Sequence, residues 1–428
     1  MTTIADPFTL PCGATLKNRI AKAAMTEQIA EADGKPNARH VRLYERWSEG
    51  GAGLLITGNV QVDRKHLEHP GNIVIEAAQG DARHEQLRAL AEAAQKDGAK
   101  AIMQISHAGR QTPKVVNPAP LAPSVVGLQL PGGTFGTPRS MTAAQLGDVE
   151  SRFAYAARIA AQTGFAGVQV HAAHGYLLSS FLNPRANLRR DPYGGSLENR
   201  ARLLLKIVER IRAEAPKDFI LSVKLNSSDF QKGGLTTEDS LTIIGWLAEK
   251  GVDLIEISGG NYEQPAMMDL QGIEKKHEEE KAESTKAREA YFLEFAEAVR
   301  AQSKVPLMVT GGFRTKDGMN EALSSNACDL VGIARPLCVQ PALPNALLSG
   351  EADSVPAYEK RLRIGPGLLG PQSPVGIVKV LNGFSVMAFF YTNIERMADG
   401  KEPLEEMSIF PAFIRGQMAT AKKAKALT

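Results

Sequence analysis

Two histidines and a tyrosine follow one short apolar segment near the middle of the chain. His171, His174 and Tyr176 come directly after Phe165-Ala-Gly-Val-Gln-Val170, whose apolar, glycine-framed composition is typical of a fully buried parallel strand. Histidines three positions apart cannot share one face of a regular strand, so we expect the chain to leave the strand after His171 and turn. Barrel enzymes place their chemistry where a strand ends in such a donor-rich loop.

The His-x-x-His spacing leaves three interpretations open. A metal site needs more ligands, and no carboxylate or cysteine lies at ligand spacing from this pair, so we predict no metal there. A pair of buried structural histidines is the second interpretation. The third is a pair that hydrogen-bonds a substrate.

Two polar residues lie inside other apolar segments. Lys224 lies within 219–225, and a lysine buried in a strand requires a counter-charge. Such a lysine is also the nucleophile expected of a Schiff-base lyase or aldolase. Gln104 lies within 100–106, where a buried amide needs several hydrogen-bond partners.

Glycines mark a candidate phosphate site. Gly311 and Gly312 follow the segment 305–310, and Gly332-Ile-Ala-Arg335 follows the next apolar segment. Barrel enzymes commonly bind phosphate at the last two strands with loop amides, which glycines leave accessible. Arg335 could pair with the phosphate dianion.

These residues fall into one repeating order of elements. Eight apolar segments alternate with helical ones: 19–25, 53–58, 100–106, 165–170, 219–225, 252–257, 305–310 and 329–333. Helices are expected at 40–49, 83–96 and 199–214. The order predicts an α/β fold, a (β/α)8 TIM barrel with a C-terminal extension. A doubly wound sheet is the rival, but the loop after the first strand lacks its glycine-rich turn.

The barrel domain is predicted to span residues 1–340 and the extension 341–428. The proline- and glycine-rich connection 111–142 has the length of a lid. A second connection, 261–286, carries a charge run that favours a solvated surface. In the extension we expect a helix at 386–397, packed on the barrel or on a partner subunit of a homo-oligomer, and a frayed lysine-rich tail at 419–428.

The composition predicts a soluble cytoplasmic protein. The chain has 428 residues, 43% of them hydrophobic, and 50 basic against 47 acidic side chains. This balance argues against nucleic acid or a membrane surface as the main partner. Three scattered cysteines form no disulfide framework, and no uncharged apolar run reaches the roughly 18 residues of a membrane span.

One long motif resembles a known family. The stretch HAAHGYLLSSFLNPRANLRRDPYGGSLENRAR, which begins at His171, is similar to the signature of the old yellow enzymes, the FMN-dependent ene-reductases. The resemblance implies an FMN cofactor reduced by NADPH or NADH, and a ping-pong transfer of hydride to the C=C bond of an α,β-unsaturated carbonyl compound. His171 and His174 would bind the carbonyl oxygen, and Tyr176 would protonate the substrate.

The same resemblance implies the residues of the flavin site. Backbone at the ends of the first two strands and one glutamine side chain would meet the ring, the Thr26 hydroxyl would face its C4 carbonyl, and the glycine loops would hold the phosphate. The positions are Ala24, Met25, Thr26, Gly58, Asn59, Gln104, Gly311, Gly312, Ala334 and Arg335. Lys224 replaces the arginine of most relatives and would stabilise anionic reduced flavin. Gln28 stands near where many bacterial relatives have a substrate-facing tyrosine, so we place it at the substrate.

Three other functions remain open. The flavoprotein could reduce quinone or nitro acceptors, or hold FMN without turnover. The third is the phosphate-binding lyase with Lys224 as its nucleophile, which would carry no flavin.

Overall fold

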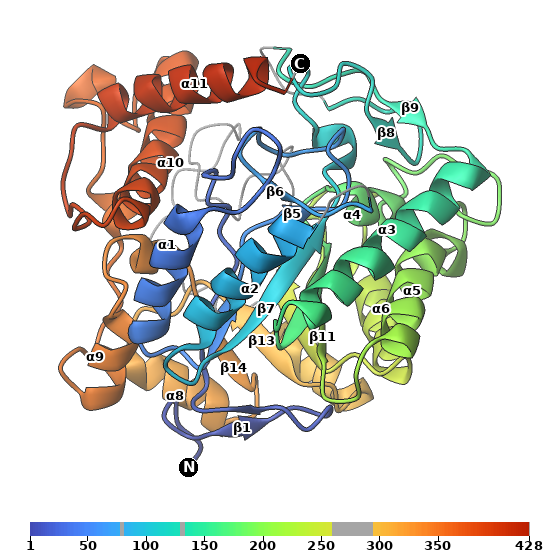
Figure 1. The fold of residues 1–428 in the computed structure, drawn as a ribbon, viewed down its shortest axis with the longest axis horizontal. Helices are drawn as coiled ribbons and strands as arrows, with labels where there is room; N and C mark the ends of the chain where they lie inside the picture. The colour runs from blue at the N-terminus through green and yellow to red at the C-terminus, as the bar shows by residue number, and fades with distance from the viewer. Residues whose placement is uncertain (78–80, 129–132, 259–293, 428) are drawn as a thin grey trace.

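Eight parallel strands form a closed sheet at the centre of the molecule (Figure 1). The computed structural model describes residues 1–77, 81–128, 133–258 and 294–427. The barrel strands are β3 (Ile20–Lys22), β4 (Leu54–Ile56), β7 (Lys100–Ser106), β10 (Gly167–Ala172), β11 (Ile220–Asn226), β12 (Leu254–Ser258), β13 (Leu307–Thr310) and β14 (Leu330–Ile333). They pair in parallel in this order, and β7 closes on β10 with Val168 opposite Met103. The predicted (β/α)8 barrel is confirmed.

The strands begin slightly later than their apolar runs. β7 matches its predicted range, whereas the others start one or two residues further along. The prediction for β10 was wrong at its end, because the strand continues to Ala172 and therefore includes His171. His171 stays in register opposite Lys224 of β11, and the turn begins only after Ala172.

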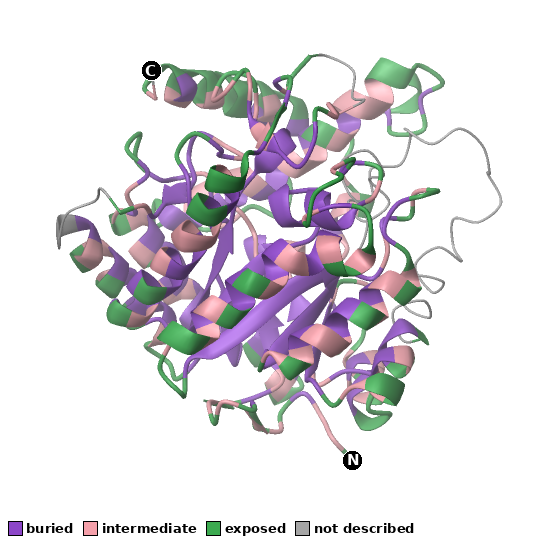
Figure 2. Cartoon of the chain, turned by 90° about the vertical axis from the view of Figure 1, so that its right-hand side faces the viewer, coloured by how far each residue is buried: buried purple, intermediate pink, exposed green. Residues whose placement is uncertain are grey.

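Helices cover the outside of the barrel (Figures 1 and 2). They are α1 (Ala38–Glu49), α2 (Asp81–Gln95), α3 (Ala143–Gln162), α4 (Leu177–Leu182), α5 (Leu197–Glu214), α6 (Thr237–Glu249), α8 (Lys316–Ser324) and α9 (Leu343–Ser349). The predicted helices that correspond to α1, α2 and α5 are confirmed, each starting two residues earlier than expected. At α1 and α5 the reason is the cap: the Asn37 and Ser196 side chains accept backbone N–H bonds from the first turn.

The barrel interior is apolar at one end and polar at the other. Side chains alternate along a strand, so every second residue faces inward. Ile102, Ile220, Leu254 and Met308 form an apolar cluster with Leu10 and Leu16 of the N-terminal hairpin, β1 (Phe8–Thr9) and β2 (Thr15–Leu16). Two residues further along the same strands come Gln104, Ser222, Glu256 and Thr310, and Lys224 follows on β11. The carboxyl ends of the strands therefore carry the polar side chains.

Short strands and long connections surround this polar end. β5 (Val60–Gln61) pairs with β7 and β6 (Ile73–Val74) with β5. In the described parts of the connection 111–142, β8 (Leu121–Ala122) pairs with β9 (Arg139–Ser140), and Gln111 donates to the His174 carbonyl at 3.0 Å. Its role as a lid stays a prediction. The charge run predicted within 261–286 lies outside the described residues.

The C-terminal extension contains two helices, α10 (Gly376–Ala398) and α11 (Ile409–Lys425), which lie against each other beside α1 (Figure 1). The expected helix at 386–397 is the second half of α10, and an ion pair of 2.7 Å joins Arg39 of α1 to Asp399. The prediction of a frayed tail was wrong. The chain is helical to Lys425, because Lys423 donates to the Gln28 carbonyl and Thr420 hydrogen-bonds His69 at 2.9 Å.

By length and composition alone, α10 could cross a membrane. Buried residues make up 39% of its apolar window, and they include Phe389, Phe390 and Ile394 of the main hydrophobic cluster. Packing within this fold therefore accounts for part of its apolar character.

Candidate active site

A pocket of about 190 Å³ opens at the polar end of the barrel. It is lined by Ala24, Thr26, Gln28, Asn59, Glu68, His69, Gln104, His171, His174, Tyr176, Lys224 and Tyr391. Nine of these twelve were predicted as site residues from the sequence. Glu68, His69 and Tyr391 were not, and Tyr391 comes from α10 of the C-terminal extension.

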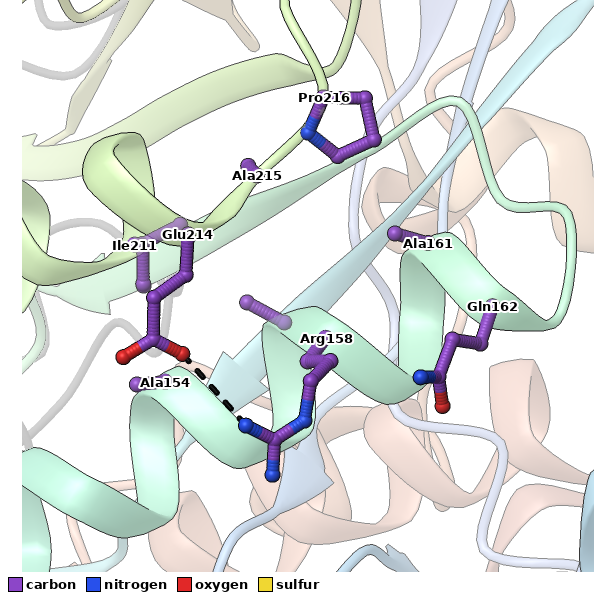
Figure 3. Close-up of a pocket in the computed structure, with 9 residues that line it drawn as sticks. Ala154, Arg158, Ala161, Gln162, Ile211, Glu214, Ala215 and Pro216 are labelled. Carbon is purple, nitrogen blue, oxygen red and sulfur yellow. Dashed lines mark ion pairs between the residues drawn. The ribbon is translucent and has the colours of Figure 1, made fainter.

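A larger depression of about 340 Å³ lies between α3 and α5 on the outside of the barrel (Figure 3). Its lining consists mainly of alanines and the exposed Arg158–Glu214 pair, separated by 3.6 Å. Arg158 and Glu214 face solvent, and their charges compensate each other. We therefore place the chemistry in the barrel pocket.

Three rings converge in that pocket. The His171 ring lies 5.1 Å from that of His174 and 4.9 Å from that of Tyr176, with both pairs edge to face. His174 adopts a left-handed backbone with φ of 61°, and its N–H donates to Asn226 at 3.2 Å. This strained turn lets two histidines from one strand end meet. The structure thus brings together the three predicted catalytic residues.

Both histidines are uncharged at neutral pH. Burial lowers the pKa of His171 well below its ordinary value and that of His174 to about 3, with a smaller contribution from the charge of Lys224. The Nδ1 atom of His171 accepts the Ala173 N–H at 3.2 Å, so its proton is on Nε2. The Nε2 atom of His174 shares a 2.6 Å hydrogen bond with Ser258. Each ring can therefore offer one N–H donor.

Lys224 already has a counter-charge within the protein. Its ammonium donates to Glu256 at 2.9 Å, and the Glu256 side chain has no exposed surface. Glu256 also accepts hydrogen bonds from Gln169 (2.9 Å) and Thr310 (2.8 Å), and Gln104 donates to Gln169 at 2.6 Å. The polar chain Gln104–Gln169–Glu256–Lys224 crosses the barrel. Glu256 and Gln169 were not predicted from the sequence, although a polar residue within an otherwise apolar strand is a signal that marks both.

Glu68 is a second carboxylate at the pocket. Thr26, Asn59 and Tyr176 all donate to it, and Asn72 reaches it at 3.5 Å. The hydroxyl of Thr26, which we predicted would face the flavin, is thus directed toward Glu68. Burial raises the pKa of the Glu68 carboxyl, although its four donors oppose the shift.

The ends of β3 and β4 approach each other closely at Gly58. A Cβ there would lie 2.5 Å from the Met25 carbonyl oxygen and 2.4 Å from a Glu27 carboxylate oxygen, so only glycine fits. The Gly58 N–H donates to Glu27 at 2.8 Å. Glu27 also accepts from Tyr44. Met25 and Gly58 do not line the pocket. The close contacts of Gly58 with Met25 and Glu27 fix the ends of β3 and β4 beside it.

The C-terminal helices complete the rim of the pocket at Gln28. Gln28 has a left-handed backbone with φ of 62°, its carbonyl accepts from Lys423 of α11, and its side chain hydrogen-bonds Tyr391 of α10. The sequence predicted Gln28 at the substrate, and the structure places its side chain in the pocket lining.

One other cluster of ligand-type residues lies in the described part of the chain. Asp63, His66 and His107 are buried together. The His66 Nδ1 contacts Asp63 at 2.8 Å, its Nε2 accepts the Leu121 N–H, and the His107 ring stacks on that of His66 at 4.3 Å. Because Nε2 of His66 accepts the Leu121 N–H, its proton is on Nδ1 and donates to Asp63, so both nitrogens of this ring already have partners. This cluster is a hydrogen-bonded support for the loop.

Comparison with known proteins identifies the group to which this barrel belongs. The model of the NADH:flavin oxidoreductase / NADH oxidase family matches residues 4–354. The chain belongs to this family. The resemblance of the motif after His171 to the old yellow enzymes is confirmed, and the family supports FMN as cofactor and NAD(P)H as reductant.

Individual relatives span most of this length. The NADH-dependent flavin oxidoreductase iliE of Hypocrea jecorina is 38% identical over 358 residues, which cover 80% of this chain and 88% of the relative. NADPH dehydrogenase of Halalkalibacterium halodurans is 31% identical over 352 residues, covering 82% and 96%. The iliE protein of a Neonectria species is 40% identical over 354 residues, 79% of this chain, which span only 46% of its own length.

Solved structures show the same fold. A 2-naphthoyl-CoA reductase complex superposes with a TM-score of 0.72 at 25% identity, covering 82% of this chain and 53% of the other. The old yellow enzyme homologue from Zymomonas mobilis superposes with a TM-score of 0.68 at 24% identity, covering 83% and 95%. At 24% identity, the likeness to the Zymomonas mobilis protein shows a shared fold alone.

The donor set of the barrel end fits FMN. Gly311 and Gly312 both have left-handed backbones, with φ of 86° and 89°, and a Cβ on Gly311 would meet no atom within 4 Å. The space around Gly311 leaves room for a ligand at this turn, although the Gly311 N–H itself donates to the Gly332 carbonyl at 3.3 Å. Arg335 follows Ala334 at the end of β14, and its guanidinium lies 3.7 Å from Glu359. None of these four residues lines the 190 Å³ pocket, so their role in phosphate binding stays a prediction.

Proposed function

We propose that this FMN-dependent NAD(P)H oxidoreductase reduces the activated C=C bond of α,β-unsaturated carbonyl compounds. The observation that supports it is the convergence of His171, His174 and Tyr176 in one pocket, with both imidazoles uncharged. Two neutral N–H donors suit a carbonyl oxygen on which negative charge builds during the reaction. A phenol beside them can act as the acid at neutral pH.

Each residue has a separate role in this proposal. FMN supplies the hydride when bound. His171 and His174 hold the substrate carbonyl through Nε2–H of His171 and one ring N–H of His174, and Tyr176 gives its hydroxyl proton to the α-carbon. Lys224 stabilises the negative charge of the reduced cofactor. Because NAD(P)H and the enone use the same pocket in turn, they should compete with each other.

The ion pair of Lys224 weighs against the lyase. A Schiff-base nucleophile must be an uncharged amine, whereas the 2.9 Å contact with buried Glu256 favours the ammonium form. Membership of a flavin oxidoreductase family also favours redox chemistry.

An anaerobic absorbance titration tests the proposal. The FMN-loaded protein is titrated with NADH or NADPH and then with cyclohexenone. A flavin spectrum that bleaches with the nicotinamide and returns with the enone is expected. Bleaching without return would contradict enone reduction and point to quinone or nitro acceptors, which the same reduced sample can then be given.

A further inference from the structure

Glu68 lies beside the residue to which we assign the proton transfer. It belongs to the loop between β5 and β6, and its carboxylate accepts from the Tyr176 hydroxyl on Oε2 and from the Thr26 hydroxyl on Oε1. Two amides contact the same carboxylate, Asn59 on Oε2 and Asn72 on Oε1. Asn72 also accepts the His69 N–H at 2.8 Å, which fixes the loop. Glu68 is therefore held against Tyr176 by its own segment.

The protonation state of Glu68 decides where the Tyr176 proton points. The amides of Asn59 and Asn72 act here only as donors, whereas a hydroxyl can donate or accept. When Glu68 is ionised, Tyr176 must direct its single proton to the carboxylate. When Glu68 carries a proton on Oε2, it donates to the phenol oxygen, and the Tyr176 proton can point to a substrate. Only the neutral acid thus leaves Tyr176 able to protonate a substrate.

Burial of Glu68 raises the pKa of its carboxyl, the direction that favours the neutral acid, while its four hydrogen-bond donors act against that shift. The other titratable side chains of the pocket are His69, His171, His174, Tyr176, Lys224 and Tyr391. Burial lowers the pKa of all three histidines and raises that of Tyr391, so these groups are uncharged at pH 7. The charge of Lys224 is paired with Glu256. In the part of the chain that the structure describes, the hydrogen bonds to Glu68 come from neutral groups.

We propose that Glu68 is a positioning residue that directs the Tyr176 hydroxyl to the substrate and returns a proton to it after each turnover. This inference rests on the proposed ene-reduction. As hydride reaches the β-carbon, Tyr176 gives its proton to the α-carbon. The resulting phenolate takes the carboxyl proton of Glu68, and the Glu68 carboxylate is reprotonated from water. The net consumption is one hydride and one proton per double bond.

The first test is the pH dependence of flavin reoxidation by cyclohexenone in stopped flow. Wild-type rates should be highest with neutral Glu68 and fall as the pH rises through its pKa. Glu68→Gln keeps a donor to Tyr176 but cannot pass on a proton, so we expect a roughly 10–100-fold lower rate at pH 7 without that descending limb. Flavin reduction by NAD(P)H should change less than about twofold, since it needs no acid. Glu85→Gln, which removes a charge on α2 outside the pocket, is the control.

A variant that is slow but keeps the descending limb would show a merely structural role and overturn the proposal. The second test needs no turnover: tyrosine ring NMR on FMN-loaded protein, with the Tyr176 signal among eight tyrosines assigned by Tyr176→Phe. Tyr176 should ionise at lower pH in Glu68→Gln, because no carboxylate charge then opposes the phenolate. If Tyr176 ionises at the same pH in wild type and in Glu68→Gln, the coupling between the two residues is refuted. This result does not depend on ene-reduction. If cyclohexenone reoxidises neither protein but the Tyr176 titration shifts, only the proposed ene-reduction fails.

Discussion

The buried pair of Lys224 and Glu256 makes a quantitative prediction. The two charges lie 2.9 Å apart, with 8% and 0% of the side chains exposed. Removing one partner of such a pair leaves an uncompensated charge away from water, at a cost of about 3–5 kcal/mol. We therefore expect Lys224→Met and Glu256→Gln each to lower the free energy of unfolding by about that amount.

The double variant should recover much of this loss. With both charges gone, the amide introduced by Glu256→Gln can still hydrogen-bond Gln169 and Thr310, and no charge is left buried. We expect Lys224→Met/Glu256→Gln to lie within about 2 kcal/mol of wild type, which gives a coupling energy of several kcal/mol. Urea unfolding, followed by tryptophan fluorescence with and without saturating FMN, measures all four proteins.

The same four proteins report on the cofactor. If Lys224 hydrogen-bonds the anionic reduced flavin, an interaction of about 1.5–3 kcal/mol is lost in Lys224→Met. This corresponds to a midpoint potential lowered by roughly 30–65 mV for two electrons. Glu256→Gln should raise the midpoint, because it removes a negative charge near the ring. Losses of stability that simply add, together with unchanged potentials, would refute the idea that one pair serves both the fold and the flavin.

Three further predictions concern the fold around the site. Burial lowers the pKa of His40 to about 3, so the folded state resists its protonation. The contribution of this residue to the free energy of unfolding should be complete above pH 6.5 and fall by about 4 kcal/mol as the pH drops toward 3. Urea midpoints measured against pH should therefore fall less in His40→Gln than in wild type. Gly58→Ala should lose at least about 3 kcal/mol in the same unfolding assay and bind FMN poorly, because its Cβ would collide with Met25. Lys423→Ala should loosen α11 by about 1–2 kcal/mol and raise the KM for cyclohexenone more than it lowers kcat, since Gln28 loses its anchor; equal KM values would contradict a role of α11 at the rim.

Much of the fold could be predicted from the sequence because the signals were local. Each barrel strand lies in a mostly apolar run, as expected of strands buried on both faces. The ends were less certain, since His171 belongs to the strand by its pairing with Lys224, and pairing is not visible in a single run. The lysine-rich tail looked like a free end because its anchor on Gln28, 395 residues away, has no local signature.

The site residues also divide into those with a local sequence signal and those that only the fold brings together. His171, His174 and Tyr176 were predicted because they follow one strand within a distinctive motif. Glu68 lies in an ordinary loop sequence, and only the fold brings it to Tyr176, 108 residues further along. The motif therefore identifies the groups that we expect to touch the substrate. The loops and the C-terminal helices supply further residues of the pocket lining, among them Glu68 and Tyr391, which only the fold brings to the site.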